Sequence, residues 1–160
     1  MSRAGTIDGL KFALERSRVS GRLSLAALPR LADSGCTSAE IAFAIAGGTG
    51  AEGQPYLRVT ADGAASMTCQ RCLLALPVPI AVDAELELAE SREAAEAAED
   101  EVDRVVASRS MDVAALVEDE LLLALPMVAV HEGCELPAKD EGPRPSPFAA
   151  LAGLRRGGSG

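Results

Sequence analysis

Short segments in which apolar and polar residues alternate dominate the first ninety residues, and this feature constrains the fold more than any other. The clearest example is residues 82–88, where three acidic residues alternate with apolar ones. A period of two sends successive side chains to opposite faces, so this segment predicts a half-buried strand with an acidic face in water. Similar alternation over residues 19–25 and 40–45 predicts two more strands.

A β-hairpin is predicted over residues 56–68. Its turn is expected at Asp62-Gly63, because this dipeptide favours the two-residue turns that join antiparallel strands. Pro77 and Pro79 follow. Proline has no N–H to donate to a neighbouring strand, so these two residues suit only an edge strand or a bend.

Two segments have the period of a helix. Residues 26–33 predict a short helix with Pro29 near its start, where a missing N–H is tolerated. Asp112 is suited to cap a second helix that Pro126 ends. Several strands followed by a packed helix predict an α+β fold, either an antiparallel sheet or a small open barrel. The apolar face of the second helix would consist of Val113, Leu116, Val117, Leu121 and Ala124.

The length of 160 residues and the hydrophobic content of 48% fit one domain, which is predicted to span residues 1–137. Within it, residues 90–103 are rich in Ala and acidic residues without an apolar stripe. They predict either a solvated helix or a mobile acidic loop, and the loop is favoured. Residues 138–160 are predicted to be a flexible tail, in which a linker rich in Pro and charge precedes a short amphipathic motif at residues 146–156.

Charge is distributed unevenly within the net charge of −9. Residues 83–141 contain 4 basic and 18 acidic residues, whereas residues 142–160 contain 3 basic and no acidic ones. Phosphate binding needs clustered Lys and Arg, so the acidic residues 83–141 disfavour RNA binding over a broad surface. They favour a basic protein partner. No apolar run has the length of a signal peptide or a membrane span, which predicts a cytoplasmic protein without membrane association.

The C-x-x-C pair Cys69 and Cys72 is the most distinctive motif. His131 and Cys134, spaced H-x-x-C, would complete a Cys₃His set for a tetrahedral zinc ion if the two segments meet. The alternative is that the cysteines are reduced thiols without metal, and Cys36 is assigned to packing. A redox role is disfavoured, because redox C-x-x-C motifs usually open a helix, whereas two prolines follow here.

An enzymatic site has little support. His131 is the only histidine, and no Ser or Cys lies in a nucleophile-elbow pattern, so a hydrolase triad and a small-molecule substrate are not expected. The acidic run Glu118, Asp119 and Glu120 falls on the second helix opposite its apolar face. This position predicts either a face that simply contacts water or a docking surface for a basic partner.

The last part of the chain contains an amphipathic motif with a potential cap at Ser146 and Pro147 at the first helical position. Such a segment suits docking on a protein partner or RNA, or folding back onto its own domain. The candidate contact residues are Phe148, Leu151, Leu154, Arg155 and Arg156.

Three segments taken together, residues 68–73, 117–134 and 147–154, resemble the YceD family, whose members are called large ribosomal RNA subunit accumulation proteins. Residues 1–66 match only in general character. The resemblance implies a non-catalytic role in the synthesis, processing or stability of 23S ribosomal RNA. It also implies a basic large-subunit ribosomal protein, 23S rRNA or its precursor as partner. The alternative is a small zinc-binding or thiol-dependent protein that acts on RNA or a redox partner through Cys69 and Cys72.

Overall fold

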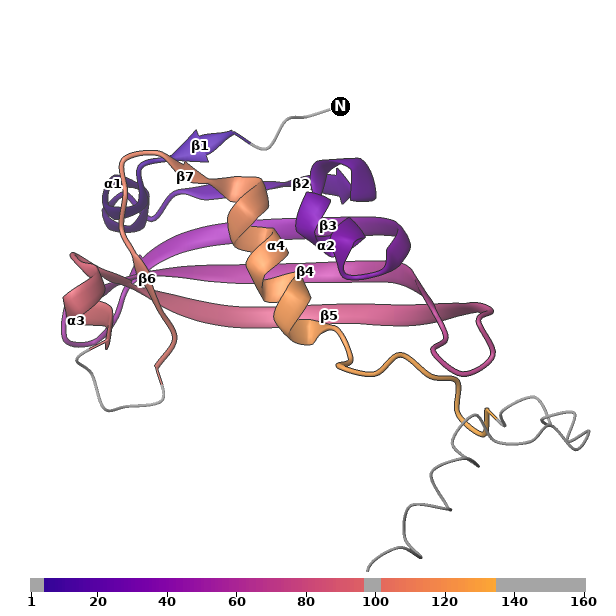
Figure 1. The fold of residues 1–160 in the computed structure, drawn as a ribbon. Coiled ribbons are helices and arrows are strands. Elements are labelled where there is room, and N and C mark those ends of the chain that lie inside the picture. The colour runs from indigo at the N-terminus through magenta and orange to yellow at the C-terminus, as the bar shows by residue number, and fades with distance from the viewer. Residues whose placement is uncertain (1–4, 97–101, 135–160) are drawn as a thin grey trace, which may run out of the picture.

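The computed structural model describes residues 5–96 and 102–134. It contains a five-stranded sheet in the order β2-β3-β4-β5-β6, antiparallel except for the parallel pair β5–β6, and a separate pair β1–β7 (Figure 1). The strands are β1 (Thr6–Ile7), β2 (Arg18–Ser24), β3 (Cys36–Thr49), β4 (Pro55–Thr68), β5 (Ala75–Ala89), β6 (Arg104–Val106) and β7 (Met111–Asp112). The helices are α1 (Gly9–Leu14), α2 (Pro29–Asp33), α3 (Arg92–Glu96) and α4 (Val113–Ala124), with a 3₁₀ turn at Leu25–Ala27.

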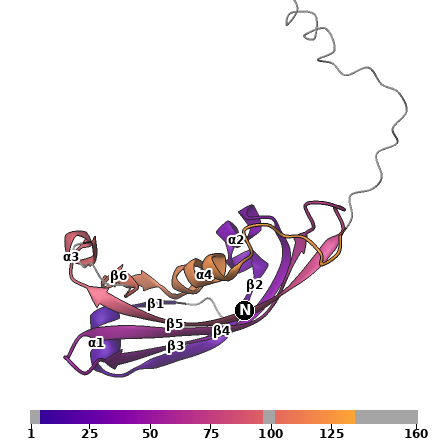
Figure 2. The ribbon, with the colours of Figure 1, turned by 90° about the horizontal axis from the view of Figure 1, so that it is seen from below.

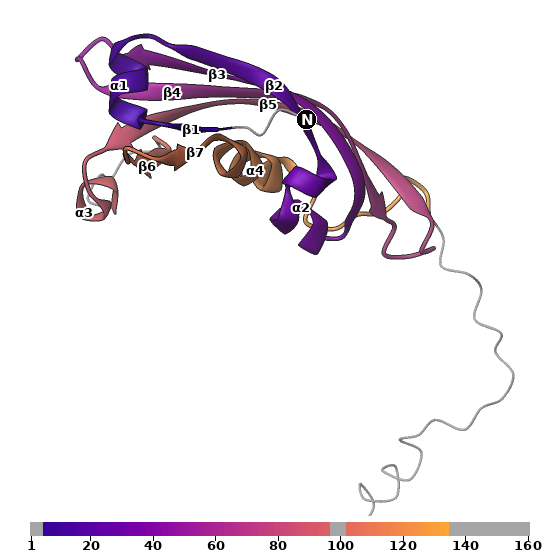
Figure 3. The same cartoon turned by 90° about the horizontal axis from the view of Figure 1, so that it is seen from above.

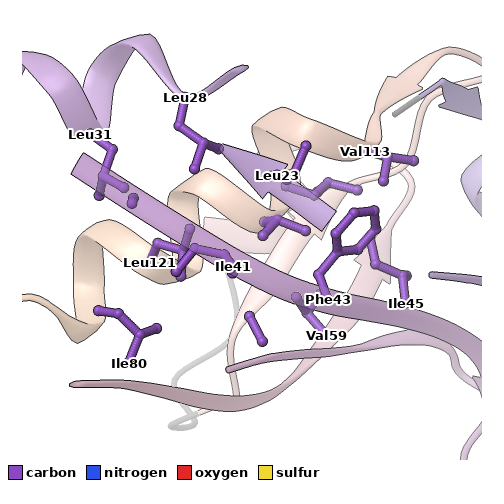
Figure 4. Packing of buried hydrophobic residues seen from close by; sticks show 14 of the residues in the cluster. Leu23, Leu28, Leu31, Ile41, Phe43, Ile45, Val59, Ile80, Val113 and Leu121 are labelled. Carbon is purple, nitrogen blue, oxygen red and sulfur yellow. The ribbon is translucent and has the colours of Figure 1, made fainter. Parts of the chain in front are cut away.

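The long central strands curve, and α4 and α2 lie on the concave face of the sheet (Figures 2 and 3). Alternate residues of β3 point to this face and are buried, among them Ile41, Phe43 and Ile45. Figure 4 shows Ile41 near Leu121 of α4, whereas Phe43 and Ile45 lie farther along β3 on the side of Val113. All of these residues and Leu31 of α2 belong to one buried hydrophobic cluster. The predicted α+β class is confirmed, and the sheet is open rather than a barrel.

Helix α4 follows the prediction from its sequence. The Asp112 carboxylate caps it by accepting from the backbone N–H groups of Ala114 at 2.8 Å and Ala115 at 3.1 Å. The helix ends at Ala124, shortly before Pro126. Ala124 is exposed, so the buried face is one residue shorter than predicted and comprises Val113, Leu116, Val117 and Leu121.

The prediction of a hairpin turn at Asp62-Gly63 is wrong. Strand β4 runs without interruption through both residues and pairs with β3 on one side and β5 on the other. The hairpin turns lie instead at residues 50–54 and 69–74. A Cβ on Gly63, which has φ +154°, would collide with the carbonyl oxygen of Glu40 on β3. Gly63 therefore permits a close approach of two strands and does not make a turn.

A Gly63→Ala substitution is expected to lower the free energy of unfolding by about 1–3 kcal/mol, because the new methyl group meets main chain that cannot move aside cheaply. Gly5→Ala is the matched control, since a Cβ there has no heavy atom within 4 Å. Urea unfolding of both variants checks this expectation. Equal stability of the two variants would contradict it.

The edge character of β5 near its two prolines is as predicted. Strand β6 pairs only with residues 87–89, so no strand covers the outer side of β5 at Pro77 and Pro79 in the described part of the chain. Farther along β5, Asp83 and Glu85 are exposed and Glu87 is half-buried, which confirms the acidic solvent face of this strand.

The acidic segment at residues 90–103 is only partly described. Residues 92–96 form the short helix α3, and residues 97–101 lie outside the described part. The predicted tail at residues 138–160 also lies outside it. None of the helices in the described ranges combines the length and the apolar character that crossing a membrane requires.

Candidate metal centre

The two halves of the proposed ligand set meet in the fold. Cys69 and Cys72 lie in the turn between β4 and β5, and His131 and Cys134 lie on the chain that leaves α4. The four possible ligand atoms all lie within 4.8 Å of one another. The sequence prediction that these residues form one cluster is therefore confirmed.

The distances within this cluster suit a tetrahedral zinc ion. The sulfur atoms of Cys69 and Cys134 are 3.7 Å apart, and the Cys72 sulfur is 3.4 Å from Nδ1 of His131. Two thiolates that bind the same zinc at about 2.3 Å are separated by about 3.8 Å in a tetrahedral site. Three sulfurs and one imidazole nitrogen are also a donor set that zinc takes in structural sites.

The ring of His131 is oriented for binding through one nitrogen. Its Nε2 lies 3.0 Å from the carbonyl oxygen of Ala75, which can only accept a hydrogen bond. Nε2 therefore carries the proton, and in the neutral ring Nδ1 keeps its lone pair directed at the cluster. The Ala75 carbonyl thus fixes the tautomer that a metal needs.

Backbone hydrogen bonds shape both ligand turns. In the first turn, the Leu73 N–H donates to the Cys69 carbonyl and the Cys69 N–H donates to the Leu74 carbonyl, each at 2.9 Å. In the second turn, the Cys134 N–H donates to the His131 carbonyl at 3.2 Å, and Gly133 has φ +67°. Each turn therefore presents two ligands on the same side.

Hydrogen bonds also join the two turns directly. The Gln70 N–H donates to the Ala129 carbonyl at 2.8 Å, and Nη1 of Arg71 donates to the Cys134 carbonyl at 2.9 Å. Segments about sixty residues apart in the sequence are thereby aligned without relying on the ligands alone. The backbone therefore helps to set the positions of the four donor atoms.

The protonation of the cluster is uneven. Backbone N–H groups, first that of Cys72 and then those of His131 and Arg71, lower the pKa of Cys69 to about 5. Burial, together with the neighbouring sulfurs of Cys72 and Cys69, raises the pKa of Cys134 to about 11. A bound divalent metal would offset the repulsion between the sulfurs and favour the thiolate form of Cys134.

Cys36 lies apart from this cluster, in the hydrophobic core. Its side chain is buried, and burial raises the pKa of the Cys36 thiol. Its assignment to packing is thus consistent with its position. It also provides a control for every experiment on the other three cysteines.

Leu73 has an unusual backbone conformation in the first turn, with φ +63°. A side chain in this left-handed region costs roughly 1–2 kcal/mol, which glycine avoids. We expect Leu73→Gly to raise the free energy of unfolding by about 1 kcal/mol, measured by urea unfolding of the zinc-loaded protein. Leu74→Ala, which removes the neighbouring exposed side chain, should change stability little. A destabilised Leu73→Gly variant would contradict this expectation.

The acidic run on α4 is placed differently from the prediction. Glu118 does not face water but is 3% exposed, and its carboxylate accepts from the Leu31 N–H at 3.0 Å and from Nε of Arg30 at 2.9 Å. The helix face that carries Glu118 packs against α2, and the sequence contains no local signal for this contact. Arg30, which the sequence analysis did not single out, joins α2 to α4.

The other two acids of this run differ in exposure. Asp119 is about half exposed and forms an ion pair of 2.5 Å with Nη1 of Arg30. Glu120 is nearly buried, and burial raises its pKa, with repulsion from Asp103 and Asp119 adding to the shift. Asp103, Asp119 and Glu120 therefore form an acidic cluster beside α4. The other candidate contact residues, Phe148, Leu151, Leu154, Arg155 and Arg156, lie outside the described residues.

Comparison with known proteins gives one clear relationship. No solved structure matches this chain. The family model described as large ribosomal RNA subunit accumulation protein YceD matches residues 57–155, which is more than half of the chain. The match covers all four residues of the candidate metal cluster and all of α4. The chain therefore belongs to the YceD family of large ribosomal RNA subunit accumulation proteins.

Proposed function

We propose that this protein is a non-catalytic binding factor of the cytoplasm that supports the synthesis, processing or stability of 23S ribosomal RNA and contains a structural zinc ion. The family description supports the ribosomal role. The proposal that the protein is non-catalytic rests on the four possible ligands Cys69, Cys72, His131 and Cys134, which would occupy every position of a tetrahedral zinc ion. Four protein ligands fill a tetrahedral zinc, whereas catalytic zinc sites keep one position for water or substrate.

The proposed partner is a basic large-subunit ribosomal protein. The cluster of Asp103, Asp119 and Glu120 supports this choice, because the raised pKa of Glu120 reflects burial and repulsion between carboxylates. A cationic side chain docked there would relieve that repulsion. Glu118 is 3% exposed and accepts from Arg30 and from the Leu31 N–H, so it is the least accessible acid of this run. Asp119 is about half exposed, and a cationic partner would compete there with Arg30, so Asp119 and Glu120 are proposed as the contact residues. Phe148, Leu151, Leu154, Arg155 and Arg156 are proposed as contacts from the tail.

The experiment is a pull-down with tagged, zinc-loaded protein, before and after nuclease treatment, that quantifies large-subunit ribosomal proteins and 23S rRNA. Basic ribosomal proteins that remain bound after nuclease would support a protein partner. Loss of all partners would show that RNA is the ligand and would overturn the role of the acidic cluster.

A matched pair of variants tests the acidic cluster itself. Asp119→Asn combined with Glu120→Gln removes two carboxylates from the cluster, whereas Glu93→Gln combined with Glu96→Gln removes two from α3. Only the first pair should reduce capture and lower the ratio of 23S to 16S rRNA in a strain that lacks the wild-type gene. Equal effects of the two pairs would mean that net charge alone governs binding.

Thiol chemistry at Cys69 is the alternative function, and the lowered pKa of this residue favours it. A nucleophilic thiol must also be reached by its target, and Cys69 is 0% exposed. Brief alkylation of the native, chelator-free protein distinguishes thiol chemistry at Cys69 from a structural metal centre. Modification of Cys69 within seconds would support thiol chemistry, and protection would support the structural centre.

A further inference from the structure

We propose that the C-terminal segment of this chain, residues 147–156, docks in cis on an apolar surface formed at the metal centre. This surface, the knuckle patch, consists of Leu73, Leu74, Met127 and Val128. Their exposed fractions are 74%, 66%, 99% and 60%. The proposal goes beyond the role in 23S rRNA accumulation, and its charge argument rests on the proposed zinc ion. A partner that binds the same tail residues would have to displace the segment from this surface.

The four residues lie on two segments that touch each other. His131 contacts Cys72 and Ala75, which flank Leu73 and Leu74 in the sequence. Ala129, which follows Met127 and Val128, accepts a hydrogen bond from Gln70. The same contacts that assemble the candidate ligands therefore hold the two exposed apolar pairs on adjoining segments. Exposed apolar groups on adjoining segments mark a binding surface more often than scattered ones do.

The backbone conformation of Leu73 also indicates a binding surface. A leucine side chain is exposed at a left-handed position where glycine would be free of strain. Packing in the core does not offset the backbone strain at Leu73, because its side chain is 74% exposed. Strain retained at an exposed apolar residue is typical of sites that bind something else.

The surroundings of the knuckle patch select a cationic occupant. A zinc ion with three thiolates and one neutral imidazole has a net charge of about −1. Glu132 lies within the second ligand turn, and the last turn of α4 contains no basic residue to balance its free carbonyl groups. Arg71 is the nearby cation in the first turn, and its guanidinium donates to the Cys134 carbonyl. An apolar segment with positive residues at one end fits this surface.

The chain itself supplies such a segment. Phe148, Leu151 and Leu154 recur every three residues, and Arg155 and Arg156 follow directly. Twelve residues, 135–146, connect it to Cys134, whose sulfur is 3.7 Å from that of Cys69. A tether of this length reaches up to about 40 Å when extended, so it can return to the patch. Short tethers give effective concentrations in the millimolar range, at which even a small apolar contact is populated.

The extent of the family match agrees with the proposed contact between residues 147–156 and the knuckle patch. It begins in β4, runs through the knuckle patch and continues to residue 155, past the connecting residues. Both the surface and its proposed occupant therefore belong to the part of the chain that the family model covers. The N-terminal elements up to residue 56 lie outside it.

Hydrogen–deuterium exchange of the full-length, zinc-loaded protein tests the proposal. We expect the amides of residues 148–154 to exchange at least tenfold more slowly than in a variant with Leu74→Asp and Met127→Asp. Both substituted side chains are largely exposed, so the fold should tolerate the change. Leu14→Asp, at a residue 65% exposed on α1, is the control and should leave the protection intact. Zinc content and circular dichroism confirm that all three proteins are folded.

Three results would overturn intramolecular docking. The first is exchange of residues 148–154 at the rate of an unstructured peptide in the wild-type protein. The second is protection that the patch variant retains. The third is protection that appears only when the protein concentration is raised, because this would place the segment on a second copy. None of these outcomes bears on the level of 23S rRNA, so failure here and failure of the proposed function are distinguishable.

Discussion

Replacing Cys69 with Ser is expected to reduce bound zinc from stoichiometric to a minor fraction and to lower the thermal midpoint of unfolding markedly. The reason is that the Cys69 side chain is fully buried, and its sulfur is 3.7 Å from that of Cys134. The free energy of zinc binding contributes directly to folding when the site is absent from the unfolded chain. Elemental analysis of protein purified without chelator, followed by thermal unfolding, measures both effects.

Cys36→Ser is the control, because Cys36 lies in the core outside the cluster. It should keep full zinc content whatever its effect on stability. Removal of the metal from the wild-type protein should raise hydrogen exchange at residues 127–134 more than in the centre of β3 and β4, since α4 and the concave face form a core of their own. Substoichiometric zinc in the wild-type protein, or equal zinc in both variants, would contradict a metal centre.

Replacing Glu118 with Ala is expected to lower the free energy of unfolding by about 3 kcal/mol. The substitution leaves the buried Leu31 N–H without its acceptor and removes the partner of Arg30 between α2 and α4. Breaking a buried, hydrogen-bonded charge contact costs about 3–5 kcal/mol, and the partial exposure of Arg30 favours the lower end. Urea unfolding with a two-state fit measures the loss.

Two neighbouring substitutions show which part of this contact matters. Glu118→Gln keeps a neutral acceptor for Leu31 and should recover part of the loss. Asp119→Ala removes an ion pair whose two side chains are about half exposed, so stability should stay within about 1 kcal/mol of the wild type. Equal losses for Glu118→Ala and Asp119→Ala would show that the buried carboxylate has no special role.

Local patterns in the sequence determined several features of this protein. The alternation over residues 82–88 predicted a strand with an acidic solvent face, and the capped apolar period from Asp112 predicted α4. Both predictions hold because each depends only on residues a few positions apart in the sequence. The spacings C-x-x-C and H-x-x-C likewise predicted which residues lie together within each short turn, whereas the meeting of the two pairs in one cluster depends on the tertiary structure.

Only the tertiary structure decided features that depend on residues distant in the sequence. Asp62-Gly63 carries the local signal of a turn, yet two flanking strands hold it extended, because Gly63 admits the main chain of Glu40. Glu118 carries the local signal of a solvent-facing helix position, yet α2 covers it and supplies Arg30, 88 residues away. In both cases packing against a distant segment outweighed the local preference, and a distant partner leaves no trace in the local pattern.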